Sequence, residues 1–332
     1  MNKRKIYYTL HSGKNSKLTY YIQSYLSIYT PHAIKNLYYR HLMASLEGRK
    51  DREYILQRVN YYNQLTADTF NREKFLQESV ELRNQQITGQ KVYYLDSYRY
   101  AKGFPLNYRW RLLPGDITYV PEVPSITKSR PLNLPCYNSI VMKLDKVRHF
   151  LFVKDKKKWV DKKNVAIFRG IIGREVENGE LKRRGRYDFV KMFHGDPMFD
   201  IGVIDKEYPE WHTEKLTIGE HLDYKFIMAL EGNDVASNLK WVMSSNSIAV
   251  MPRPTCESWF MEGKLIPDYH YIEIKSDYSD LKEKLNYYIA HPDEAQAIVD
   301  HAHEFVDQFR DLKREKLISL LVLRKYFDIT NG

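Results

Sequence analysis

The sequence contains little cysteine and none of the signatures that mark the commonest enzyme classes. Its two cysteines, Cys136 and Cys256, are far apart and form no CxxC pair, which argues against a disulfide framework and a zinc site. No G-x-G-x-x-G, Walker, H-E-x-x-H or G-x-S-x-G motif occurs, so dinucleotide, P-loop and common hydrolase sites lack support. A D-x-D is also missing, which disfavours a metal held by two carboxylates on a nucleotide diphosphate. We predict no bound metal and no cofactor.

Long apolar runs are missing as well. No segment approaches the roughly 18 apolar residues that span a membrane, and the basic first 21 residues lack the apolar centre of a signal peptide. We therefore expect a cytoplasmic protein. Its net charge of +10 favours polyanionic partners such as nucleic acid, anionic lipid or phosphorylated glycans. Two basic clusters, at 154–163 and 182–186, form part of that excess.

Hydrophobic periodicity divides the chain into a helical beginning and two strand-containing regions. Residues 17–84 carry apolar positions at helical spacing, and short strand-like runs begin near residue 91. After residue 160, strands at 164–171, 199–205, 226–230, 247–251 and 270–274 alternate with helices, which implies a parallel sheet covered by helices. We predict a helical extension (1–85), an N-terminal α/β lobe (86–160), a C-terminal α/β lobe (161–310) and a final helix (311–332).

The segment 226–275 holds the clearest candidate for a binding site. Gly232 and Asn233 follow a strand, and Ser237 and Lys240 lie three residues apart at the start of the helix that we expect next. A strand, loop and helix in that order point amide donors at whatever occupies the loop, which suits a phosphate. Arg169 closes another strand, where it could grip a diphosphate or form a structural ion pair.

Three motifs follow one another in this part of the chain: FRG at 168–170, LEGNDVASNLKWVMSSNSIAVM at 230–251 and ESWFMEGKLIPDYHYIEIKSDYSDL at 257–281. In this order they resemble glycosyltransferase family 90, the CAP10-like group. The similarity covers roughly residues 90–310. The earlier GDITYVPEVPSITKSRP at 115–131 resembles the bacterial lipopolysaccharide branch of the family.

The resemblance implies a GT-B fold with two Rossmann-like lobes, a UDP-sugar donor held by the C-terminal lobe, inversion at the anomeric carbon and no required metal. By position it implies that Arg169 and Gly170 open the diphosphate-binding segment. A second arginine of that segment is either Arg174 or Arg186, and we prefer Arg186 because the residues after it match the family's next helix. Lys240 matches a family lysine, but the arginine that accompanies it is replaced by Asn238.

Family members also carry an aspartate just after a strand of the N-terminal lobe. The candidate is Asp96, expected at the end of a strand formed by residues 91–95 and partly desolvated by neighbouring tyrosines. There it would accept the proton of the attacking hydroxyl. Asp116 is the second choice, since it precedes the strand expected after it.

The sequence thus predicts transfer of glucose or galactose from a UDP-sugar to a hydroxyl of a lipopolysaccharide or lipooligosaccharide core. The basic surface would hold the enzyme peripherally on an anionic inner membrane. One alternative is a related enzyme that acts on a protein or capsule glycan. A second, from another class, is a non-enzymatic nucleic-acid-binding protein, suggested by the positive charge and 27 tyrosines.

Overall fold

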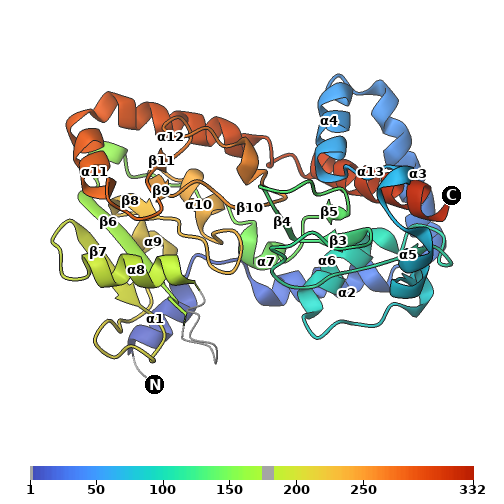
Figure 1. The fold of residues 1–332 in the computed structure, drawn as a ribbon, viewed down its shortest axis with the longest axis horizontal. Helices are drawn as coiled ribbons and strands as arrows, with labels where there is room; N and C mark the ends of the chain where they lie inside the picture. The colour runs from blue at the N-terminus through green and yellow to red at the C-terminus, as the bar shows by residue number, and fades with distance from the viewer. Residues whose placement is uncertain (1–2, 174–182) are drawn as a thin grey trace. The chain divides into compact units, whose positions relative to one another are not determined.

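A computed structural model describes residues 3–173 and 183–332 and divides the chain into two units (Figure 1). The first unit comprises residues 1–15, 148–254 and 264–308, and the second comprises 16–147, 255–263 and 309–332. Each unit is therefore built from three separate pieces of chain. The N-terminal region, which we expected to form one helical extension, is divided between the units: residues 1–15 belong to the first and the following residues to the second.

A five-stranded parallel sheet forms the centre of the first unit. Its strands lie in the order β11-β9-β8-β6-β7 and have these bounds: β6 Lys163–Gly170, β7 Phe199–Val203, β8 Tyr224–Met228, β9 Ile248–Met251 and β11 Ile272–Glu273. Every pairing is parallel, with Ile167 opposite Ile227 and Val250 opposite Ile272. All five strands overlap segments that the sequence predicted, which confirms an α/β class.

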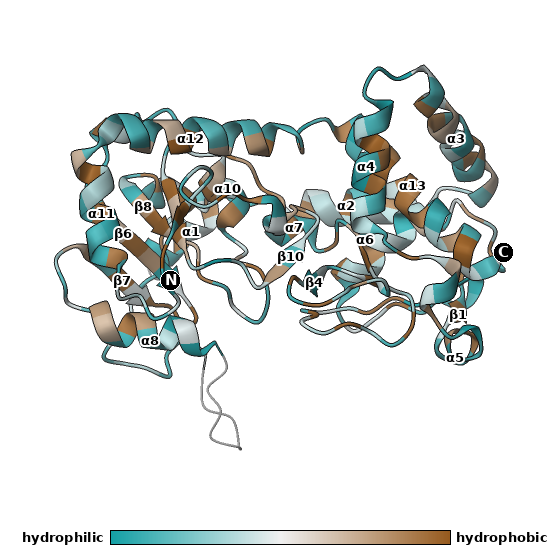
Figure 2. Ribbon diagram, turned by 45° about the horizontal axis from the view of Figure 1, so that its top comes forward, coloured by the Kyte–Doolittle hydropathy of each residue, from teal (hydrophilic) through white to brown (hydrophobic). Residues whose placement is uncertain are grey.

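Helices cover this sheet because its strands are apolar on both faces. Phe168, Phe226 and Val250 pack with Phe189 and Leu285 in one buried cluster, and the brown strands of Figure 2 show the same apolar centre. The helices of the unit are α1 Lys3–His11, α8 Arg184–Phe193, α9 Ile218–His221, α10 Leu239–Met243, α11 Leu281–Ala290 and α12 Pro292–Asp307. The chain breaks between α11 and α12 at His291-Pro292.

The second unit is mainly helical. Its helices are α2 Lys17–Tyr29, α3 His32–Ala44, α4 Arg52–Tyr62, α5 Arg72–Glu78, α6 Lys91–Ala101 and α13 Leu312–Asn331, and α7 Lys146–His149 starts at its boundary. The strands pair two by two: β1 Val80–Glu81 with β2 Arg109–Trp110, β3 Ser125–Thr127 with β5 Ser139–Val141, and β4 Ser129–Pro131 with β10 Cys256–Ser258. Among the residues described in this unit, no larger sheet is present.

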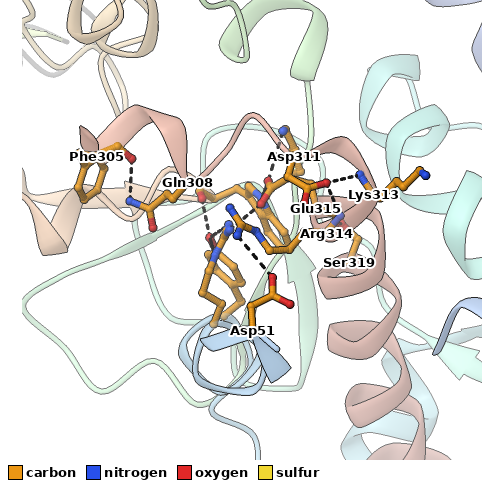
Figure 3. Close-up of polar contacts among 12 residues, drawn as sticks. Asp51, Phe305, Gln308, Asp311, Lys313, Arg314, Glu315 and Ser319 are labelled. Atoms are coloured by element: carbon orange, nitrogen blue, oxygen red, sulfur yellow. Dashed lines mark hydrogen bonds and ion pairs between the residues drawn. The ribbon is translucent and has the colours of Figure 1, made fainter. Parts of the chain in front are cut away.

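The N-terminus of helix α13 is capped and contacts helix α4 and the residue before it. Asp311 Oδ1 accepts hydrogen bonds from the backbone N–H groups of Lys313 and Arg314, and Arg314 Nη1 lies 3.5 Å from Asp51 Oδ2 (Figure 3). One turn later, Glu315 forms a buried ion pair with Arg58 of α4 at 2.6 Å. The cap satisfies backbone donors that a helix start leaves open.

The strand expected at 91–95 is wrong: these residues lie in helix α6. The segment is rich in tyrosine and carries a valine, a composition typical of strands. Its inward positions Tyr94, Leu95 and Tyr98 are nevertheless spaced as on a helix, and they pack against Tyr20 of α2. The strand expected after Asp116 is also wrong, because residues 116–123 are irregular.

In the described part of the chain, no helix combines the length and the apolar character needed to cross a membrane.

Candidate functional site

The strand order of the first unit creates a switch point at one edge of the sheet. The chain passes from β6 to β7 on one side, and then returns across β6 to place β8 on its other side. In open parallel sheets, ligands bind beyond the carboxyl ends of the two strands where the order reverses. Here those ends are Gly170-Ile171, after β6, and the segment 229–232, after β8.

Arg186 joins the two sides of this switch point. It lies in the first turn of α8, and its guanidinium donates to the backbone oxygens of Ile171 (3.1 Å), Leu230 (2.8 Å) and Glu231 (2.9 Å). Burial and the nearby Arg183 lower the pKa of Arg186 to about 10. The side chain therefore remains protonated at neutral pH, and its positive charge lies where an anionic ligand would be expected.

Gly232 is pressed against this arginine. A Cβ at Gly232 would lie 3.1 Å from Nη2 of Arg186 and 3.6 Å from Nε of Arg183. Any side chain here would occupy space beside the two guanidinium groups. The structure thus places Arg186 beside Gly232 and bonds it to Ile171, the residue after Gly170. Arg174, the other candidate for the second arginine, lies outside the described residues.

Arg169 forms a structural ion pair, which was one of the two roles that the sequence left open. Its Nη2 lies 2.5 Å from Oδ1 of Asp200 on β7, and its Nη1 donates to the Asp200 carbonyl oxygen at 2.8 Å. Burial by itself would raise the pKa of Asp200, but hydrogen bonds from Tyr224 and Arg169 lower it overall. Gly202 leaves room for this pair, because a Cβ there would approach Cδ of Arg169 to 3.0 Å. The Arg169 side chain is therefore bound to the neighbouring strand β7.

The helix expected right after Gly232 starts later and is shorter. Residues 231–238 form bends and turns, and α10 spans only Leu239–Met243. Asn233 is exposed and Ser237 is partly exposed, so both are reachable from solvent. Lys240, by contrast, is fully buried. It lies at the start of α10, as expected, with its side chain turned away from solvent.

Asp96 is not at a strand end but in the middle of α6, where it is fully buried. Its Oδ2 accepts a hydrogen bond from the backbone N–H of Lys146 at 3.0 Å, and its Oδ1 lies 3.1 Å from Lys146 Nζ. This carboxylate joins α6 to the start of α7. Asp116, the second choice, forms an ion pair with the buried Lys128.

Sequence reasoning missed a buried polar cluster in the second unit. Arg130 of β4 donates to Glu257 of β10 at 2.7 Å, and the Tyr61 hydroxyl donates to the same carboxylate. Burial and the Glu257 charge raise the pKa of the tyrosine. Arg130 and Glu257 lie in the segments 115–131 and 257–281 that resemble the family. Nothing in the sequence indicated that these two residues would pair across strands.

The first basic cluster is partly engaged within the fold. Lys162 is buried and lies 2.7 Å from Asp155, and Lys157 lies 2.9 Å from Asp223. These pairs neutralise part of the charge that the sequence suggested for an anionic surface. Across residues 3–173 and 183–332, no group of three or more His, Cys, Asp or Glu side chains is placed to hold a metal ion.

Comparison with known proteins defines the class. The model of glycosyl transferase family 90 matches residues 138–326, which is more than half of the chain, and the chain belongs to this family. A particular relative is the protein described as O-glucosyltransferase LpsA from Dichelobacter nodosus. The two are 36% identical over 279 residues, a stretch that covers 83% of each chain. This membership sets aside a non-enzymatic nucleic-acid-binding protein.

Proposed function

We propose that this glycosyltransferase moves glucose from UDP-glucose to a hydroxyl of a bacterial lipopolysaccharide or lipooligosaccharide core. The observation that carries the donor side is Arg186 at the switch point, bonded to the ends of both β6 and β8. Glucose is favoured over galactose because the Dichelobacter nodosus relative is described as an O-glucosyltransferase. The lipopolysaccharide acceptor rests on the resemblance carried by residues 115–131.

In this proposal the diphosphate of the donor lies beside Gly170 and Gly232, within reach of Arg186. An arginine with three of its five N–H groups donating to carbonyl oxygens keeps two for phosphate oxygens. Its fixed position costs little reorganisation when negative charge develops on the departing UDP. Asn233 and Ser237 offer further polar groups on the accessible side of the same loop, and neither a metal nor a cofactor is required.

The remaining parts of the mechanism are a GT-B arrangement, inversion at the anomeric carbon and a general base. Inversion needs one carboxylate to accept the acceptor's proton as its oxygen attacks. Asp96 stays our candidate for this base. Because it is fully buried against Lys146, the role requires that this ion pair separate when the acceptor binds.

A UDP-release assay tests the proposal directly. The purified chain is incubated with UDP-glucose or UDP-galactose, with and without EDTA, and with truncated lipooligosaccharide or a peptide as acceptor. We expect turnover with UDP-glucose and lipooligosaccharide that survives EDTA. Turnover on the peptide alone would transfer the assignment to a protein acceptor, and a preference for UDP-galactose would change the sugar. If no UDP-sugar binds or turns over, the donor assignment is wrong.

A further inference from the structure

Helix α2 presents its apolar residues to solvent. Tyr20 and Ser24 are its buried residues, and the helix runs beside α6 (Figure 1). The outward face carries large apolar side chains at successive helical turns, with exposed fractions of 72% for Leu18, 51% for Ile22, 67% for Leu26 and 77% for Tyr29. A helix on the surface of a soluble unit normally turns this stripe toward the core.

Tyrosines run along the flank of the same helix. The rings of Tyr21 and Tyr25 stack with centroids 6.4 Å apart, and those of Tyr25 and Tyr29 stack at 6.3 Å. Tyrosine combines an apolar ring with a polar hydroxyl, and it is enriched at the level of lipid headgroups, where one end is apolar and the other wet. Further exposed apolar residues follow in α3, namely Ile34, Leu37 and Tyr38.

Charge around α2 has a single sign along the chain. The first acidic residue is Glu47, whereas seven lysines and arginines precede it. Lys14 and Lys17 lie at the N-terminal end of α2, and both are exposed. An apolar helical face with cations at its edge matches the chemistry of an anionic bilayer surface, whose headgroups attract lysine while its acyl boundary accepts leucine and isoleucine.

We propose that α2 docks on an anionic lipid surface, with its axis in the plane of the interface and Leu18, Ile22 and Leu26 buried in it. A second copy of the chain is a weaker occupant. A 13-residue helix is about 20 Å long, so one face offers less than the roughly 800 Å² per partner that a stable dimer buries. The cations beside it would also repel those of the copy. The proposal does not depend on the sugar or the acceptor.

Vesicle flotation with the full chain tests this surface. Vesicles of phosphatidylglycerol and phosphatidylethanolamine are compared with vesicles of phosphatidylcholine, without donor or acceptor. The test variant is Ile22→Gln combined with Leu26→Gln, and the matched control is Leu134→Gln with Leu312→Gln, which are equally exposed apolar positions of the same unit. Circular dichroism and UDP binding of each variant establish that the fold and the donor site are unchanged.

We expect the wild type and the control to float with anionic vesicles, and the test variant to bind about tenfold more weakly or worse. Lys14→Gln and Lys17→Gln should each weaken binding about fivefold at low salt. Equal binding to neutral vesicles, or equal loss in the control, would overturn the proposal. A wild type that binds neither kind of vesicle would also overturn it. The same holds if the wild type forms a dimer that the test variant does not form, because the apolar face would then bind a second copy.

Discussion

Replacing Arg186 with methionine is expected to weaken UDP binding and to loosen the segment after β8. The substitution removes three hydrogen bonds that a cationic donor makes to the backbone oxygens of Ile171, Leu230 and Glu231. Since the group is only half-buried, we expect a loss of about 2–4 kcal/mol in the free energy of unfolding. Removing the cation beside the proposed diphosphate position should weaken UDP binding about 10- to 100-fold, equivalent to about 1.4–2.8 kcal/mol.

Calorimetric titration with UDP and urea unfolding measure the two effects separately. Arg184→Met is the matched control, because it removes the same charge from the same first turn of α8. That side chain is 80% exposed and pairs with Asp188 of its own helix, at 3.4 Å. We expect it to leave UDP affinity within about twofold, as for an exposed pair. Equal weakening by both variants would show that general charge acts rather than the position of Arg186, and unchanged affinity in Arg186→Met would refute the site.

Three further perturbations test other parts of the structure. Asp96→Asn should cost about 3–5 kcal/mol in urea unfolding by breaking a buried pair. Adding Lys146→Met should restore part of that stability without restoring turnover, and recovery of turnover would refute Asp96 as the base. Burial, with nearby cations, lowers the pKa of Lys35 to about 7. The unfolded chain then holds one more proton between pH 7 and about 10, so this group makes stability rise with pH over that window. Lys35→Met should flatten the rise in thermal unfolding midpoint, and an unchanged slope would contradict the shift. Gly202→Ala should lower the free energy of urea unfolding by about 1–3 kcal/mol, because the new Cβ would overlap the side chain of Thr213. An unchanged free energy would show that the strand adjusts to the larger residue.

The parallel sheet was predictable because its strands carry their own signal. Runs such as 226–230 and 247–251 are short, apolar and bounded by polar turns, and a strand buried on both faces requires that composition. The helix α6 was not predictable in this way. Its tyrosines suit a strand by composition, and only packing against Tyr20 of α2 decides that they lie on one helical face.

Around the candidate site, the sequence by itself determined the residue types, and tertiary structure decided which of them meet. Gly170 and Gly232 follow different strands, and nothing local brings them together. The ends of β6 and β8 lie side by side because these two strands pair, and Arg186 then bonds to residues after both. Tertiary packing likewise turned Arg169 toward Asp200 and buried Lys240 in the first unit, and it buried Asp96 against Lys146 in the second. The partners and the exposure of a side chain depend on the residues packed around it, and those residues come from segments that are distant in the sequence.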